Sequence, residues 1–228
     1  MKRCAVALAL GALFLPGAAA SSPRLTVFAA SSLATVFPRV DKAPRYDFDG
    51  SDRLYAQLGA GAPADVFAAA SPKYAQLAFQ KGLVLRPVVF ATNSLVLIVP
   101  AANPAHIRKP ADLRRKGIKL VIGAAGVPIG DYTRKVLARM GLGAALKNVV
   151  SEERDARSIL AKVSLGEADA GFVYVTDARV AGSRVHSLTL PVQAQPTVKY
   201  EIAVVKASAN RAAAQAFVRR VLGAAGQG

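Results

Sequence analysis

Short runs rich in β-branched residues alternate with amphipathic stretches along this chain, and no other feature constrains the fold as strongly. We expect the amphipathic stretches to form helices, several of them ending at a glycine in the C′ position: Gly59, Gly82, Gly141 and Gly166. The predicted strands are residues 25–28, 64–68, 94–99, 119–122, 170–175 and 200–205. This pattern indicates an α/β fold with mostly parallel strands.

Residues 1–20 have the three-part layout of a secretory signal peptide. Lys2 and Arg3 precede an uncharged apolar run, and three alanines supply a cleavage site after Ala20. The run is too short for a permanent membrane anchor, and no later stretch is long and apolar enough to span a bilayer. We therefore expect a soluble protein exported to the periplasm or another extracytoplasmic space.

Cysteine and histidine usage argues against most enzyme and metal chemistry. Cys4 is the only cysteine and would leave with the signal peptide, so no disulfide and no thiol nucleophile are expected. His106 and His186 are far apart and have no further ligand at metal-binding spacing. Neither a nucleophile elbow nor a phosphate-binding P-loop occurs. We predict no catalytic residues and no bound metal cation.

The chain is strongly basic, with a formal net charge of +16, and removing Lys2 and Arg3 leaves 16 − 2 = +14. The basic residues are scattered, and no basic run is interleaved with stacking aromatics. Nucleic acid is therefore not an expected partner, whereas weak steering of anions is compatible with this charge.

Four predicted helices begin directly after strand or turn segments, at Ser31–Ser32, Gly50–Ser51, Pro128–Gly130 and Asp155–Ala156. A helix start presents free N–H groups and the positive end of the helix dipole, which together suit an anion. Ser and Asp are also ordinary helix caps, so the spacing alone leaves both readings open. Tyr174, at the end of a predicted buried strand, is either a ligand donor or a core tyrosine.

Several segments resemble the periplasmic molybdate-binding proteins of ABC transporters. The Gly-Ala-Pro-Ala-Asp-Val-Phe block and the Gly-Phe-Val-Tyr-x-x-Asp-Ala block are fairly specific for that family. In order and spacing the similar segments cover nearly all of the mature chain: 27–33, 50–54, 59–71, 93–96, 127–132 and 166–178.

The resemblance implies a type II periplasmic binding protein fold, with two lobes, each a mostly parallel sheet flanked by helices, and a cleft between them. Lobe 1 would comprise residues 21–95 and 201–228, and lobe 2 residues 96–200, with two crossing strands as the hinge. The protein would be a monomer that captures a small ligand and delivers it to an ABC permease.

The resemblance also assigns the ligand and its donors. The ligand would be a tetrahedral oxyanion, molybdate or tungstate, bound without any cofactor or free metal ion. Two hydroxyl positions fall on Ser32 and Ser51, two backbone amides on Ile129 and Ala156, and a third hydroxyl on Tyr174. A binder of another oxyanion, such as sulfate or phosphate, would share nearly every feature. An enzyme on the same scaffold is a less favoured alternative.

Three departures from the family pattern carry further expectations. Asp52 replaces a small residue after the second serine, and we expect it to point outward, toward Arg53 or another base. Pro38 and Pro44 fall in a short segment, so the first helix should be curtailed. Residues 223–228 end the chain where relatives continue to an apolar tail, so lobe 1 should pack differently there.

Overall fold

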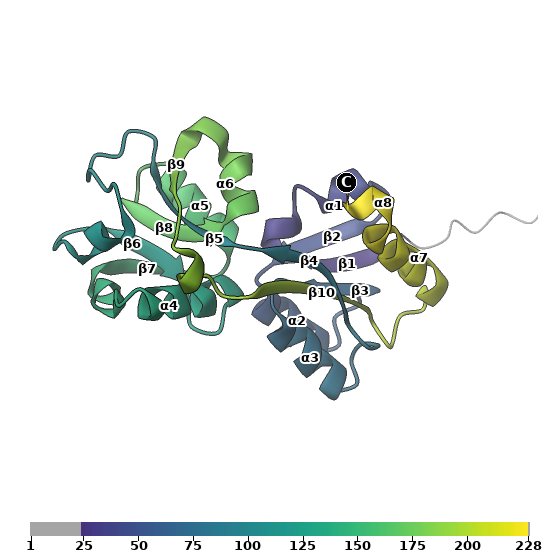
Figure 1. Ribbon diagram of the computed structural model, residues 1–228. Helices are drawn as coiled ribbons and strands as arrows, with labels where there is room; N and C mark the ends of the chain where they lie inside the picture. Colours follow the sequence, from purple (N-terminus) through teal and green to yellow (C-terminus); the bar gives the residue numbers. More distant parts are fainter. Residues whose placement is uncertain (1–23, 228) are drawn as a thin grey trace, which may run out of the picture.

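The computed structural model describes residues 24–227, and they form two lobes, each built on one five-stranded sheet (Figure 1). The predicted signal peptide lies outside the described residues. Within residues 24–227 no helix is both long enough and apolar enough to cross a membrane.

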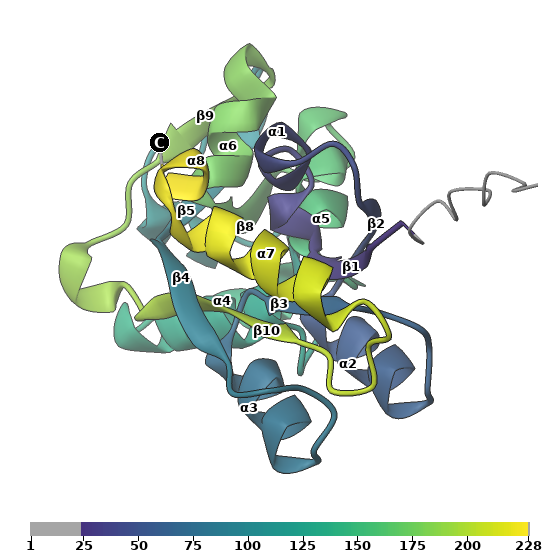
Figure 2. The ribbon, with the colours of Figure 1, turned by 90° about the vertical axis from the view of Figure 1, so that its right-hand side faces the viewer.

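The lobe 1 sheet has the strand order β2-β1-β3-β10-β4. Figure 2 shows α7 crossing one face of this sheet, with α2 and α3 on the other side. The side chains of β1 alternate accordingly, since Val27 and Ala29 pack with Phe217 of α7, and Phe28 packs with Leu54 of α2. Its elements are β1 (Thr26–Ala30), a 3₁₀ turn η1 (Ser31–Leu33), α1 (Phe37–Val40), β2 (Arg45–Asp49), α2 (Ser51–Gly59), β3 (Val66–Ala69), α3 (Pro72–Gln80), β4 (Val88–Asn93), β10 (Val198–Val204), α7 (Arg211–Leu222) and α8 (Ala224–Gln227).

The lobe 2 sheet has the order β7-β6-β8-β5-β9. Its helices α4 and α5 contact β6 and β8, and four short 3₁₀ turns complete the connections. Its elements are β5 (Leu95–Pro100), η2 (Pro110–Arg114), β6 (Leu120–Gly123), α4 (Pro128–Arg139), η3 (Gly143–Asn148), β7 (Val149–Glu153), α5 (Ala156–Ser164), β8 (Ala170–Tyr174), α6 (Val175–Ala181), η4 (Gly182–Arg184), β9 (Val185–Leu188) and η5 (Val192–Ala194).

In each sheet four strands run in one direction and the fifth runs against them. The reversed strand is β10 in lobe 1, antiparallel to β3 and β4, and β5 in lobe 2, antiparallel to β8 and β9. The remaining pairs are parallel. The expected mostly parallel, two-lobed architecture is therefore confirmed, and both reversed strands adjoin the crossings between the lobes (Figure 1).

The two crossings lie side by side. The chain passes from β4 to β5 through Ser94 and returns from η5 into β10. Gln195, on the return segment, clamps the backbone of Leu95: its Oε1 accepts from Leu95 N at 3.0 Å, and its Nε2 donates to Leu95 O at 2.8 Å. Two adjacent strands joined in this way suit a hinge, because they flex together without separating.

Local sequence explains most helix ends. Gly82, Gly141 and Gly166 adopt positive φ after α3, α4 and α5, as predicted, because glycine alone enters this conformation freely. The prediction for Gly59 was wrong: α2 includes Gly59, and the positive φ falls on Gly61 (φ 85°). Glycine occurs at both positions, and the later one takes the C′ position, after the C-cap residue Ala60.

The acidic residue of the Gly-Ala-Pro-Ala-Asp block has a structural role in lobe 1. Asp65 is buried, and its Oδ2 accepts from Thr26 N at 2.8 Å at the start of β1. Its Oδ1 accepts from the hydroxyl of Ser208 at 2.6 Å, in the loop between β10 and α7. The block thus ties three chain segments together at the end of the sheet remote from lobe 2.

The first helix is curtailed, as expected, to η1 and the four-residue α1, which begins beside Pro38. Phe37 of α1 is buried and packs against Phe90 and Phe217, with ring centroids 5.8 and 5.7 Å apart. Hydrophobic packing therefore holds this segment on the sheet although hydrogen bonds do not continue the helix.

Candidate functional site

The carboxyl ends of the parallel strands of both lobes face each other across the cleft. In lobe 1, β1 runs into Ser31–Leu33 and β2 runs into α2. In lobe 2, β6, β7 and β8 lead to α4, α5 and α6. Ligands of open α/β sheets bind at such ends, because the helix starts gather there.

One small cavity between the lobes is lined by all five residues singled out from the sequence: Ser32, Ser51, Ile129, Ala156 and Tyr174. Its other lining residues are Ala30, Ser31, Asp49, Gly50, Ala70, Val127, Pro128 and Asp155. Residues up to 144 positions apart in the chain, Ala30 and Tyr174, thus share one site. The free volume is about 10 Å³, close to what one water molecule needs, so the site admits only a ligand of a few atoms.

The helix starts at this cavity keep their first N–H groups available. Gly50 and Val127 are the N-cap residues of α2 and α4, and neither helix has a side-chain cap. Asp131 of α4 instead accepts from Gly126 N at 2.9 Å, turned back toward the preceding loop. Pro128 at the first position of α4 lacks an N–H, so Ile129 offers the first amide of that helix.

The start of α5 is partly capped. Asp155 Oδ1 accepts from Ser158 N at 2.8 Å, which leaves the amide of Ala156 in the first turn for another acceptor. The carboxylate also lies 3.6 Å from Arg154 Nε, measured from Oδ2. Asp155 therefore caps α5, and the guanidinium group of Arg154 compensates its negative charge.

Ser51 is held at the cavity by a backbone hydrogen bond. Its side chain is buried, and its Oγ accepts from Ala70 N at 3.0 Å. This bond uses one lone pair and leaves the O–H free to donate to an acceptor in the cavity, which Ser51 lines.

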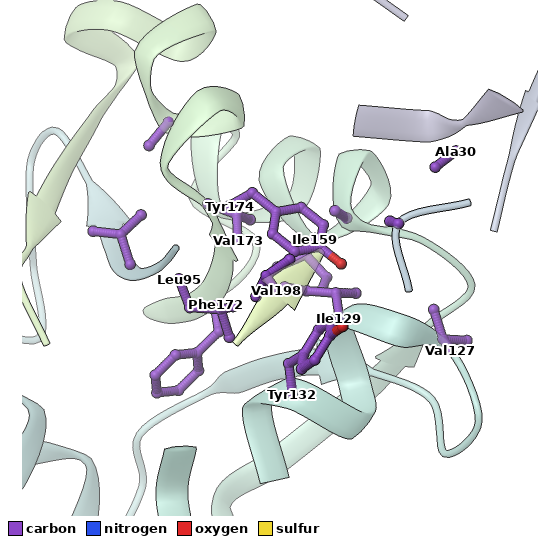
Figure 3. Packing of buried hydrophobic residues seen from close by; sticks show 14 of the residues in the cluster. Ala30, Leu95, Val127, Ile129, Tyr132, Ile159, Phe172, Val173, Tyr174 and Val198 are labelled. Atoms are coloured by element: carbon purple, nitrogen blue, oxygen red, sulfur yellow. The ribbon is translucent and has the colours of Figure 1, made fainter. Parts of the chain in front are cut away.

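Tyr174 contributes a hydroxyl that has no hydrogen-bond partner among the described residues. The residue is 2% exposed, and burial, followed by nearby Tyr200 and Tyr132, raises its pKa well above the usual value. Figure 3 shows Tyr174 close to Ile129 and Tyr132 at the start of α4. A buried and unpaired O–H is costly, and an acceptor in the cavity would remove that cost.

Among residues 24–227, no lysine or arginine lines this cavity. The two carboxylates at its edge are both engaged, since Asp49 accepts from Gly50 N at 2.8 Å and pairs with Arg53 Nε at 3.1 Å. Positive potential here therefore comes from N–H groups, hydroxyls and helix dipoles. Such a site can bind and desolvate an anion without a buried basic side chain.

Asp52 does not line the cavity, in agreement with the expectation that it points away from a ligand there. The expected pairing with Arg53 or another base was wrong, because Asp52 forms no ion pair among the described residues. Arg53 pairs with Asp49 across one turn, and Asp52 Oδ1 is buried without a partner in the described chain. Burial, followed by Asp49, raises the pKa of Asp52. The helical i, i+4 geometry favours Asp49 over the adjacent residue as the partner of Arg53.

The lobes touch closely around the cavity. A Cβ on Gly50 would lie 2.5 Å from the carbonyl oxygen of Arg154, on the opposite lobe. Lys73 Nζ lies 3.1 Å from Asp131 Oδ2, and the hydroxyl of Tyr74 donates to Gly126 O. These contacts hold the two lobes in a closed arrangement.

A larger cleft of about 430 Å³ adjoins the cavity and shares Ser31, Ser32 and Asp155 with it. Arg154, Arg157 and Arg184 line this arginine cleft. A still larger hollow of about 770 Å³ lies at the other end of lobe 1, near Asp65 and Asn210. It lies away from the strand ends and helix starts that face the other lobe, so we place the site in the small cavity.

Sequence reasoning missed two residues here. The sequence indicates that Gly50 lies at a helix start and that Tyr200 lies in a strand, but it does not indicate that either contributes to the site. The hydroxyl of Tyr200 lies 2.9 Å from Ser32 Oγ. Both depend on contacts between distant segments, so no local pattern marks them.

Comparison with known proteins places this architecture in a family. Residues 25–228 match the family model described as bacterial extracellular solute-binding protein. The molybdate-binding protein ModA of Mycobacterium tuberculosis is 38% identical over 213 residues, covering 89% of this chain and 80% of that protein.

Two solved structures share the fold. The periplasmic molybdate-binding protein of Azotobacter vinelandii has a TM-score of 0.78 at 22% identity, covering 89% of this chain and 94% of that one. The sulfate-binding protein SubI of M. tuberculosis has a TM-score of 0.70 at 18% identity, covering 90% and 83%. The family model and the 38% identical relative together show that this chain belongs to the bacterial extracellular solute-binding proteins, within the ModA family.

Proposed function

We propose that this protein captures a tetrahedral oxyanion, molybdate or tungstate, and delivers it to the permease of an ABC importer. The observation that carries the proposal is the small cavity lined by Ser32, Ser51, Ile129, Ala156 and Tyr174, with no basic side chain from the described part of the chain. The 38% sequence identity to the M. tuberculosis molybdate-binding protein supports the choice of anion.

The proposed donors divide between the lobes. Ser32 and Ser51 belong to lobe 1, and Ile129, Ala156 and Tyr174 belong to lobe 2. Neither half satisfies four oxygens alone, so the anion binds the closed form more tightly and shifts the lobes toward it. The bound anion is larger than the free volume of about 10 Å³, so the residues that line the cavity shift slightly when it binds.

Each lobe moves as a unit in this proposal, about the paired crossings. The division is close to the expected one, residues 21–95 with 201–228 against residues 96–200, but Leu95 moves with β5 of lobe 2 and residues 198–200 move with β10 of lobe 1. The closed protein, a monomer, is the form that the permease recognises. Residues 1–20 act as a signal peptide and direct the protein to the periplasm or another extracytoplasmic space.

Selectivity follows from the donor set. A fully deprotonated anion accepts at every oxygen, whereas hydrogen phosphate also needs an acceptor for its proton. The nearest carboxylates, Asp49 and Asp155, already accept from backbone N–H groups. Sulfate has no proton to place, so sulfate is the competing ligand that a test must include.

A thermal-unfolding panel tests the proposal. The protein is heated with molybdate, tungstate, sulfate, phosphate or chloride at matched ionic strength. A ligand at about a thousand times its Kd stabilises the folded state by about 4 kcal/mol, which raises Tm visibly. We expect the rise with molybdate and tungstate only. An equal rise with sulfate or phosphate would replace the proposed ligand, and no rise with any oxyanion would refute the proposal.

A further inference from the structure

Tyr200 lies behind the candidate site, and its hydroxyl contacts one of the proposed donors. It is buried on β10, and its OH lies 2.9 Å from Ser32 Oγ. Its ring packs edge-on against Tyr174 and Phe90, with centroids 5.7 and 6.0 Å away. Tyr200 does not line the cavity itself, so any effect on a ligand must pass through Ser32.

The direction of the Ser32–Tyr200 hydrogen bond decides what Ser32 can do. If Ser32 donated to Tyr200, its only proton would be lost to an anion in the cavity. If Tyr200 donates to Ser32, the serine O–H is free to donate to the ligand.

A third residue biases this direction. Asn93 Nδ2 lies 3.5 Å from the Tyr200 oxygen and 3.0 Å from Thr176 Oγ1. Its amide orientation is fixed, because Asn93 Oδ1 accepts from Ser94 N at 2.9 Å. The Asn93 amide therefore presents N–H to the tyrosine oxygen, which occupies one of its lone pairs and favours donation from the tyrosine O–H to Ser32.

The same network spans the hinge. Asn93 ends β4 beside the crossing, Tyr200 lies on the returning strand, and Thr176 belongs to α6 of lobe 2. The Asn93–Thr176 hydrogen bond joins the lobes, so its geometry depends on their closure.

We propose that Tyr200 is a positioning residue that turns the hydroxyl of Ser32 toward the bound anion, and that Asn93 links this orientation to lobe closure. The proposal rests on the oxyanion-binding function proposed above. The order of donation is Asn93 to Tyr200, Tyr200 to Ser32, and Ser32 to the ligand. Hydrogen bonds in such a chain polarise one another, so the last donor is strengthened.

Isothermal titration with molybdate tests the proposal in a double-mutant cycle of Tyr200→Phe and Ser32→Ala. Phe keeps the aromatic ring and removes only the hydroxyl. We expect Tyr200→Phe to raise Kd about three- to tenfold in the wild-type background. In the Ser32→Ala background the same change should alter Kd less than twofold, because the serine that it orients is gone.

A matched control comes from the same lobe. Tyr46→Phe removes a tyrosine hydroxyl that donates to Asp41 O at 2.6 Å, remote from the cavity, and should leave Kd unchanged. Equal factors in both Ser32 backgrounds would show a merely structural role for Tyr200 and overturn the proposal, as would an unchanged Kd in Tyr200→Phe.

If Tyr200→Phe fails to fold, as judged by its Tm without ligand, Asn93→Ala replaces it in the cycle. We expect about a two- to threefold rise in Kd that vanishes beside Ser32→Ala, and the absence of this coupling would overturn the proposal. If the wild-type protein and Tyr46→Phe do not bind molybdate, the proposed function has failed instead. The cycle is then repeated with whichever oxyanion raised Tm.

Discussion

The two halves of the candidate site offer donors of different kinds. Lobe 1 presents two serine hydroxyls that the protein already holds, Ser51 by Ala70 N and Ser32 by Tyr200. Lobe 2 presents the amides of Ile129 and Ala156 at helix starts and the unpaired hydroxyl of Tyr174. The lobe 1 half therefore depends on side-chain identity, whereas much of the lobe 2 half depends on backbone geometry.

The sharpest way to separate the halves is to remove the hydroxyls of lobe 1. We expect Ser32→Ala with Ser51→Ala to weaken molybdate binding by about 3–6 kcal/mol, since each hydrogen bond to a charged group contributes about 1.5–3 kcal/mol. Titration calorimetry measures the loss. Ile129→Val is the matched lobe 2 control, because it keeps the amide, and its Kd should change less than twofold. Full affinity in the serine double variant would remove lobe 1 from the site.

At Tyr174 we expect one substitution to weaken ligand binding without lowering the stability of the ligand-free protein. Tyr174→Phe should weaken binding by about 1.5–3 kcal/mol, because a hydrogen bond to the anion is lost. In the ligand-free protein it removes a buried, unpaired hydroxyl, so the free energy of unfolding should stay equal or rise by up to about 1 kcal/mol. Urea unfolding without ligand, beside calorimetry, measures both. A large loss of stability would mean that the hydroxyl has a structural partner.

Closure can be disturbed without touching a donor. Gly50→Ala places a methyl group 2.5 Å from the backbone oxygen of Arg154 on the opposite lobe, so the lobes cannot close as in this structure. The methyl group would also lie 2.6 Å from Asp52 Oδ1, but that flexible side chain can move aside more easily than the backbone. We expect weaker binding by about 1–3 kcal/mol, the usual cost of overpacking, and a more open shape in X-ray scattering with ligand. Gly59→Ala, in the same helix with nothing within 4 Å of the new methyl, is the control and should bind normally. Unimpaired binding by Gly50→Ala would show that closure at this point is unnecessary.

The lobe 2 half also has a buried carboxyl group next to Tyr174, that of Asp177 on α6. Burial raises its pKa to about 7, although Arg157 lowers it and Asp155 raises it further. The raised pKa means that the folded protein holds this proton more tightly than the unfolded chain. The resulting stabilisation of the protonated form is present at low pH and is lost as pH rises from about 4 to about 7.

Asp177→Asn removes that pH dependence. Its gain in unfolding free energy over the wild type should be near zero at pH 4 and reach about 1–3 kcal/mol at pH 8. Urea unfolding across this range measures the difference. A difference that does not change with pH would show that folding does not raise the pKa of Asp177.

The sequence predicted the interior of both sheets and missed their edges. The six predicted strands became β1, β3 and β10 in lobe 1, and β5, β6 and β8 in lobe 2, all of them interior strands. The four missed strands, β2, β4, β7 and β9, are the four edges. An edge strand is half exposed and carries polar residues, as in the Arg-Tyr-Asp-Phe-Asp of β2, so it lacks the continuous apolar run of a central strand.

The candidate site, like the sheets, was predictable from the sequence only in part. Helix starts and a strand-end tyrosine are visible locally, and the family resemblance selected five of them that prove to line one cavity. The supporting contacts were not predictable from spacing, because Ser32 and Tyr200 are 168 positions apart and Gly50 meets Arg154 only when the lobes meet. The pairing of Asp49 with Arg53 was available from i, i+4 spacing but competed with the adjacent Asp52.

If donors from both lobes surround one oxyanion in the small cavity, anomalous X-ray diffraction from crystals grown with tungstate will locate it there. Tungsten marks its own position in the map. We expect one strong peak between the hydroxyls of Ser32, Ser51 and Tyr174 and the amides of Ile129 and Ala156, with the lobes closed around it. A peak only in the arginine cleft, on Arg154, Arg157 and Arg184, would exclude the small cavity and assign binding to basic side chains instead.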